Sequence, residues 1–207
     1  IDELEQKERS TNTEVASLNQ KIESMAQNGS GKVGQGMVLA IAQLRDAAMS
    51  GRPYAAQLMA LQAIGAGNPD IMAATTRLGS AADQGLPTID TLQTKFSSIA
   101  GDVVSLARAE GGDWLDQAAG KLSQLVSLRR TDGASGDPVE DAVADIEKSL
   151  KARDIGAAVK TADALADLLQ GDARAALEPW LLDARLRARA ERALDAMHAS
   201  ALAALEK

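Results

Sequence analysis

Two copies of one pattern, 34 residues apart, constrain the fold of this 207-residue chain more than any other feature. Six positions recur at equal offsets: Leu44, Ala47, Ala48, Gly51, Pro53 and Leu58 match Leu78, Ala81, Ala82, Gly85, Pro87 and Leu92. The Leu and Ala positions share one helix face. The Gly suits the left-handed conformation after a helix end, and the Pro suits the first turn of the next helix. We therefore expect two helical hairpins, roughly Met37–Ser50 with Pro53–Ile64 and Pro69–Gln84 with Pro87–Ala100.

The composition extends this helical prediction to the whole chain. The sequence holds 41 Ala and 25 Leu among its 207 residues but only four aromatic residues. Ala and Leu favour helices, whereas strands are enriched in β-branched and aromatic residues. We expect an all-α protein with an N-terminal coiled-coil helix, helical hairpins and a C-terminal helical bundle. The 34-residue period is that of tetratricopeptide hairpins, but their Trp-x-x-Leu-Gly-x-x-Tyr signature is absent.

Residues 1–27 carry a heptad pattern typical of a coiled coil. The apolar seam, our candidate oligomerisation surface, consists of Ile1, Leu4, Val15, Leu18, Ile22 and Met25. The alternative is a single helix packed on its own domain, but so narrow a stripe favours a partner helix. Residues 28–36 are rich in Gly and predict a flexible linker.

Turn-forming residues divide the remainder of the chain. We expect a hairpin array at 37–112, an amphipathic helix at 113–130, a linker at 131–138 and a C-terminal module at 139–207. This module begins with a hairpin turning at Arg153 and Asp154. Its last helix runs from about Pro179 to Leu205, and Pro179 either opens that helix or kinks a longer one. Its predicted apolar face is Leu182, Leu186, Ala190, Ala193, Met197 and Ala201.

The helix at 113–130 is the strongest candidate for a functional surface. Its apolar stripe and cationic residues include Trp114, Leu115, Lys121, Leu122, Leu125, Arg129 and Arg130. These features suit a helix lying on an anionic bilayer. The same stripe is also typical of a helix packed into the hairpin array.

Residues 131–183 carry a net charge of −7 and residues 184–207 one of +2, so the last helix and the acidic hairpin are electrostatically complementary.

Several classes of function are disfavoured. The chain has no Cys and one His, so we expect no metal site, no cofactor and no enzymatic activity on a small-molecule substrate. An acidic chain with few aromatic residues is unsuited to nucleic acid. The pairs Asp141/Asp145 and Asp163/Asp167 are interpreted as solvated helix faces, and His198 as a surface or interface residue. The longest apolar run, Met37–Ala42, is too short to cross a bilayer.

From about Gln35 to Leu205 the chain resembles the alphaproteobacterial relatives of mitofilin, the cristae-organising protein of the mitochondrial inner membrane. The stretches that carry the resemblance are Leu44–Leu58, Gln84–Phe96, Leu125–Gly133, the Ala-rich hairpin Ala142–Leu165 and Glu178–Ala188. More distant similarity, weighted to the final third, is to HemX-like membrane proteins associated with uroporphyrinogen methylation.

The resemblance to mitofilin implies a membrane anchor upstream of Ile1, a coiled coil and a helical module on the periplasmic side of a bacterial inner membrane. It further implies membrane binding and bending, self-association, and contacts towards the outer membrane, including its β-barrel assembly machinery. The mitofilin domain maps to about Leu125–Leu205, with a lipid-binding helix at its start. Two alternatives remain: a soluble helical-repeat adaptor that docks a peptide or helix without touching lipid, and an accessory protein of the tetrapyrrole pathway.

Overall fold

The structure is a computed structural model that describes residues 34–110 and 137–205, and these residues form helices and turns without strands. A helix at residues 34–49 comes first. It is followed by α2 (Ala55–Ile64), α3 (Pro69–Leu78), the 3-10 helix η1 (Gly79–Ala81), α4 (Ile89–Glu110), α6 (Pro138–Lys151), α7 (Ile155–Ala166) and α8 (Gly171–Leu205). The predicted all-α class is confirmed, and the predicted coiled coil lies outside the described residues.

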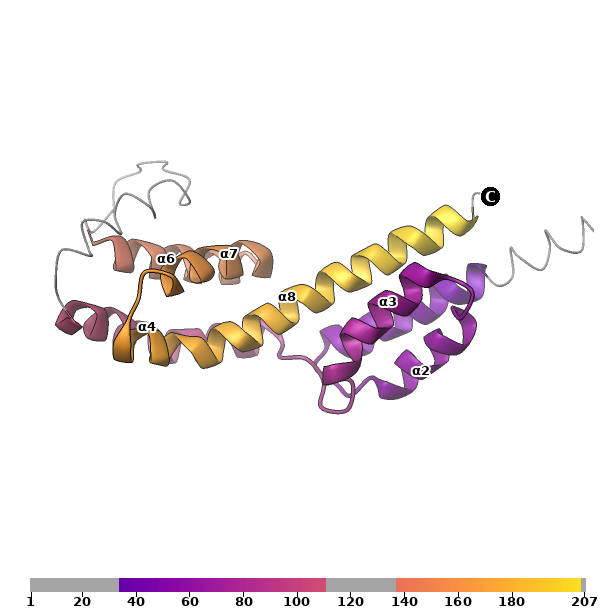
Figure 1. The fold of residues 1–207 in the computed structure, drawn as a ribbon, viewed down its shortest axis with the longest axis horizontal. Helices are drawn as coiled ribbons and strands as arrows, with labels where there is room; N and C mark the ends of the chain where they lie inside the picture. Colours follow the sequence, from indigo (N-terminus) through magenta and orange to yellow (C-terminus); the bar gives the residue numbers. More distant parts are fainter. Residues whose placement is uncertain (1–33, 111–136, 206–207) are drawn as a thin grey trace, which may run out of the picture.

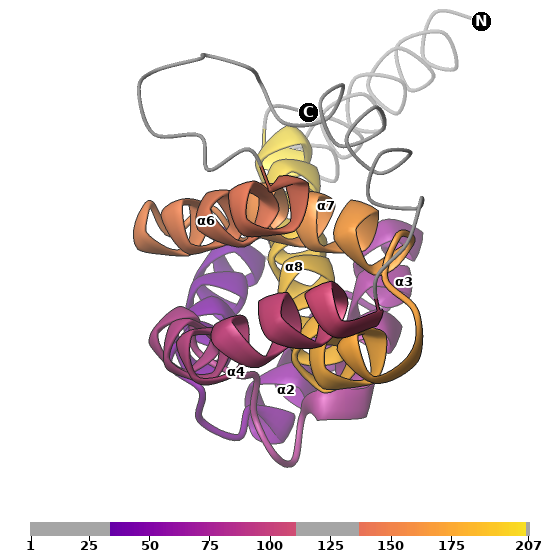
Figure 2. The same ribbon diagram turned by 90° about the vertical axis from the view of Figure 1, so that its left-hand side faces the viewer.

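The helices form two bundles that share α8 (Figure 1). The first bundle combines the helix at 34–49, α2, α3 and η1 with the second half of α8; its largest buried side chains include Ile41, Leu44, Tyr54, Leu61 and Ile71. The second bundle combines α4, α6 and α7 with the first half of α8; it buries Leu92, Phe96, Ile146, Leu165 and Trp180. Within it, α6 and α7 form one layer, and α4 with α8 forms the other (Figure 2).

Because it serves both bundles, α8 buries a different face in each. In the second bundle the buried positions are Ala173, Leu177, Trp180, Leu181, Ala184 and Ala188. In the first bundle they are Ala190, Ala193, Leu194, Met197 and Ala201. At 3.6 residues per turn the centres of these two faces are roughly 130° apart. The change of face falls at Arg187–Arg189, which is where one bundle gives way to the other.

This change of face explains where the prediction for the last helix was wrong. A single straight stripe places Leu182 in the core, yet its side chain is 56% exposed. Leu182 lies in the half of α8 whose buried face is set by the second bundle, whereas the predicted stripe follows the first. Of the two placements considered for Pro179, the structure has the longer helix with Pro179 inside it.

The two glycines of the repeat adopt the predicted left-handed conformation, with φ of +79° at Gly51 and +82° at Gly85. The two turns also contact each other, since a Cβ atom added to Gly85 would lie 2.3 Å from the carbonyl oxygen of Gly51. The prolines differ from the prediction. Pro53 and Pro87 precede α2 and α4 by two residues. Between Pro53 and α2 lies Tyr54, whose N–H bonds to the Ala82 carbonyl.

The second copy of the repeat departs from a simple hairpin. The helix predicted for Pro69–Gln84 ends at Leu78 and continues as η1. The helix after the second turn reaches Glu110 rather than Ala100. Leu92, the last of the six repeat positions, is buried in the second bundle, whereas its counterpart Leu58 is buried in the first. The second repeat therefore links the two bundles.

Candidate functional site

The described helices hold both ends of segment 111–136, which contains the predicted lipid-contacting helix. Glu110 ends α4 and Asp137 precedes α6, and both lie at the end of the second bundle far from the C-terminus (Figure 1). Two sets of polar contacts fix this end: one between Arg108 and the start of α6, the other between Glu110 and the start of α8. We call this the anchor end.

Arg108 clamps the start of α6 onto α4. Its Nε donates to Asp137 Oδ2 at 2.9 Å, and its Nη2 donates to Glu140. Asp137 also caps α6, because its Oδ1 accepts the Val139 N–H at 2.9 Å. Carboxylate caps of this kind satisfy otherwise unpaired helix N–H groups. The pKa of Arg108 is raised by these two carboxylates.

Burial acts to raise the pKa of Asp137, but the bonds from Arg108 and from the backbone N–H groups of Val139 and Glu140 outweigh it. The net result is a pKa below the ordinary value of 3.8. A carboxyl whose pKa is lowered on folding stabilises the fold above its ordinary pKa. That stabilisation is lost as the pH falls through the lowered value.

We therefore expect Asp137→Asn, which retains a capping oxygen but loses the charge, to melt at a lower temperature than the wild type at pH 7. The difference should shrink as the pH falls below 3.8, because the wild-type carboxyl is protonated as well once the pH passes through its lowered pKa. Melting curves followed by circular dichroism across this range measure it. Asp167→Asn, an exposed carboxyl outside the anchor end, is the matched control. An Asp137→Asn deficit that stays constant from pH 7 down to the lowest pH at which the protein is folded would contradict this account.

The second contact at the anchor end caps α8. Glu110 Oε1 accepts the Ala173 N–H at 3.0 Å, so a carboxylate from α4 lies at the positive end of the α8 dipole. The close approach explains the glycine at the helix start. A Cβ atom on Gly171, whose φ is +43°, would lie 2.7 Å from the same carboxylate oxygen. The last residue of α4 and the first turn of α8 are thereby held together.

The sequence-predicted site residues themselves all lie outside the described residues. These are the candidate membrane-binding residues Trp114, Leu115, Lys121, Leu122, Leu125, Arg129 and Arg130, and the candidate oligomerisation residues Ile1, Leu4, Val15, Leu18, Ile22 and Met25. Both sets therefore stay predictions. The structure adds the anchor end, where neither Arg108 nor Glu110 was recognised from the sequence, because their partners are 29 to 63 residues away.

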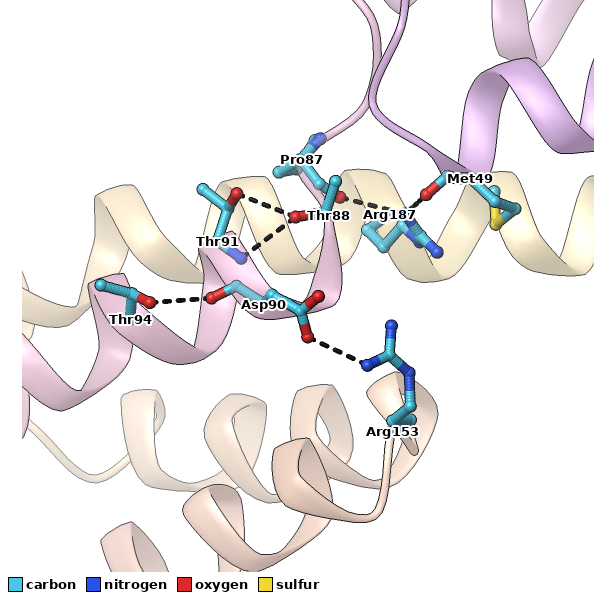
Figure 3. A network of polar contacts seen from close by, with 8 residues as sticks. All are labelled: Met49, Pro87, Thr88, Asp90, Thr91, Thr94, Arg153 and Arg187. Atoms are coloured by element: carbon cyan, nitrogen blue, oxygen red, sulfur yellow. Dashed lines mark hydrogen bonds and ion pairs between the residues drawn. The ribbon is translucent and has the colours of Figure 1, made fainter.

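A second site missed by the sequence analysis is Arg187 of α8, which is only 4% exposed. Its Nη1 donates to the carbonyl oxygens of Met49 and Pro87, each at 3.2 Å (Figure 3). Its Nε donates to Glu191 at 2.8 Å. The guanidinium thus binds the end of the first described helix and the second repeat turn at the point where the bundles meet. The sequence contains one indication that Arg187 has a separate role: it does not lie on the helix face shared by Arg185, Arg189 and Arg192.

Of the titratable residues noted in the sequence, Asp167 is exposed, whereas Asp141, Asp145, Asp163 and His198 are half-buried. Asp163 binds Arg185 Nε at 2.8 Å, which joins the acidic hairpin to the basic helix as the charge distribution indicates. Across residues 34–110 and 137–205, no cluster of three or more His, Cys, Asp or Glu side chains has the geometry of a metal site. Within the same ranges no helix has the length and apolar character to span a bilayer.

Comparisons with known proteins agree with the resemblance seen in the sequence. The family described as Mitofilin, a mitochondrial inner membrane protein, matches residues 6–201. Similar curated proteins are MICOS complex subunits. One from Talaromyces marneffei is 28% identical over 165 residues, which cover 78% of this chain and 25% of that protein. One from Pyrenophora tritici-repentis is 31% identical over 152 residues, which cover 70% of this chain and 22% of that protein.

The chain thus spans about a quarter of the length of the curated relatives it matches. These relatives are fungal, and the alphaproteobacterial origin inferred from the sequence stays a prediction. No solved structure matches the chain significantly.

Proposed function

Because the chain belongs to the Mitofilin family, we propose that it is part of a non-enzymatic scaffold that organises the inner membrane and that attaches to lipid through residues 113–130. The relatives are subunits of the MICOS complex, and their family is described as a mitochondrial inner membrane protein. In a bacterial cell the proposed location of this part is the periplasmic face of the inner membrane. Its proposed partners are anionic lipids, further copies of the chain and the outer-membrane β-barrel assembly machinery.

The observation that carries the lipid attachment is the anchor end. Arg108 and Glu110 tie the flanks of segment 111–136 to α6 and α8, so the described residues on both sides of the segment lie at one end of a packed bundle. A lipid-contacting helix needs such a support if a shallow insertion is to be transmitted to the rest of the protein. The residues at 113–130 combine Trp, an apolar stripe and a cationic end, which suits an interfacial helix that favours curved membranes.

Oligomerisation through residues 1–27 would multiply this attachment. A single amphipathic helix binds a bilayer weakly, but linked copies bind with a much higher apparent affinity because the later contacts are intramolecular. The two-bundle body then acts as a spacer between the coiled coil and the lipid-contacting helix. This arrangement would let a scaffold bend a membrane without consuming or converting any substrate.

Flotation with anionic liposomes tests this proposal. We expect the full 207-residue chain to float and Leu122→Asp or Arg129→Glu/Arg130→Glu to remain at the bottom of the gradient, because they remove the apolar and cationic contacts. Circular dichroism checks that each variant is folded. Leu182→Asp replaces an exposed leucine on α8 and Arg174→Glu an exposed arginine; both are matched controls and should float.

If neither the wild type nor the controls float, this part of the chain does not attach to lipid. The alternative of a helical adaptor that docks a partner without touching lipid would then be favoured. Flotation of the Leu122→Asp variant at the wild-type level would place lipid attachment elsewhere in the chain.

A further inference from the structure

A groove of about 510 Å³ lies on the first bundle, between the end of α3 with η1 and the α8 segment that follows the change of face. Its apolar floor includes Leu78, Leu86 and Leu186, and three arginines line it: Arg77, Arg189 and Arg192. We call it the arginine groove. No acidic side chain is among the described residues that line it, although the chain as a whole carries a net charge of −7.

The three arginines differ from most other arginines of the described chain. Ion pairs with carboxylates are made by Arg45, Arg52, Arg108, Arg153, Arg185 and Arg187. Within the described ranges, no carboxylate lies at ion-pair distance from Arg77, Arg189 or Arg192. Arg192 also borders a second hollow, whose acidic residues are Asp154, Asp163, Glu191 and Asp195. Three of these are in ion pairs with other arginines: Asp163 with Arg185, Glu191 with Arg187 and Asp195 with Arg45. Asp154 Oδ1 accepts the Ala157 N–H at the start of α7.

The groove is also held in a fixed position. Its floor is built on Tyr54, which is fully buried and whose hydroxyl donates to the Leu78 carbonyl at 2.9 Å. On the other wall, Arg192 Nε donates to the Ala188 carbonyl at 3.3 Å, which orients the side chain along α8. Three guanidinium groups from two helices thus surround an apolar hollow without a bound counter-charge in the described residues.

We propose that the arginine groove binds a peptide segment of a partner protein in which carboxylate side chains flank an apolar side chain. Arg guanidinium groups match carboxylates in geometry and bind them by charge-assisted hydrogen bonds. The leucine floor accepts the apolar side chain between them. A flat anionic bilayer is a poorer match, because its surface cannot reach the floor of a hollow between two helices. This site goes beyond the lipid attachment proposed above and does not depend on it.

Fluorescence anisotropy with a fluorescein-labelled peptide, GEELLEELG, tests the proposal on the full chain. The matched peptide, GQQLLQQLG, keeps the leucines and removes the charges. Arg189→Gln/Arg192→Gln is the test variant. Arg174→Gln is its control, because Arg174 lies on the same helix, is exposed and makes no ion pair within the described residues, yet does not line the groove. Circular dichroism confirms that both variants are folded.

We expect the acidic peptide to bind the wild type and the Arg174→Gln variant alike. Binding should be about tenfold weaker to the double variant, and about tenfold weaker for the glutamine peptide, because charge-assisted bonds are lost in each case. Equal affinity of the double variant, or of the glutamine peptide, would overturn the proposal. It would also be overturned if the peptide failed to bind while anionic vesicles bound in an Arg189- and Arg192-dependent manner, which would identify a lipid site.

Discussion

The Arg187→Ala variant is expected to lose about 3–5 kcal/mol of unfolding free energy, the range found when one partner of a buried charged network is removed. The variant leaves the Met49 and Pro87 carbonyls without this donor and Glu191 without its partner. Urea unfolding followed by circular dichroism measures the loss. Arg189→Ala, an exposed arginine two residues away, should change the stability by less than about 0.5 kcal/mol.

Arg187 also lies where the two bundles meet, so its loss should weaken the coupling between them. We expect the wild type to unfold in a single transition that broadens or splits in Arg187→Ala, because α8 then lacks the bonds to the Met49 and Pro87 carbonyls. A variant within about 1 kcal/mol of the wild type, with an unchanged transition slope, would show that the buried guanidinium does not join the bundles.

The Gly85→Ala variant is the second change with a large expected effect, about 2–5 kcal/mol of destabilisation. A left-handed residue with a Cβ costs roughly 1–2 kcal/mol. The remainder comes from overpacking against backbone, since the new Cβ would lie 2.3 Å from the Gly51 carbonyl oxygen. Thermal and urea unfolding of the purified variant measure the loss.

Gly101→Ala is the matched control for this substitution. Gly101 lies inside α4, and a Cβ atom added there would have nothing within 4 Å outside its own helix backbone and chain neighbours. Alanine there should stabilise the protein by about 0.5–1 kcal/mol, because it favours the helix and restricts the unfolded chain. If both glycine variants changed stability in the same direction, the close contact between the two repeat turns would not be a determinant of the fold.

The sequence predicted local features well where the local pattern decided them. The repeat put Leu44 and Leu78 on one helix face with their Ala partners, and the structure buries that face. The left-handed conformation predicted for Gly51 and Gly85 is confirmed. The charge distribution indicated that the acidic hairpin and the basic helix are complementary, and Asp163 pairs with Arg185 within the chain. These features follow from helix periodicity, from the conformational freedom of glycine and from opposite charge, all of which can be recognised in short windows of sequence.

The features that were missed depend on partners far away in the chain. The helix α8 contributes to two cores because it packs against elements more than 80 residues away in the sequence. One such contact is the hydrogen bond that Trp180 Nε1 donates to the Leu92 carbonyl at 2.9 Å. The same packing exposes Leu182 and buries Arg187. The anchor end has the same cause, because Arg108 and Glu110 acquire their roles only when α6 and α8 dock on α4.

Lipid contact by residues 113–130 can be measured directly at Trp114. The chain has two tryptophans, and Trp180 is buried against Phe96, with ring centroids 4.6 Å apart. Trp180→Phe keeps an aromatic ring there and leaves Trp114 as the single tryptophan. Anionic vesicles, with and without brominated lipid chains, are added to this folded variant. We predict a blue shift of the Trp114 emission and its quenching by the brominated lipids. An emission spectrum that neither shifts nor is quenched would contradict lipid attachment through this helix.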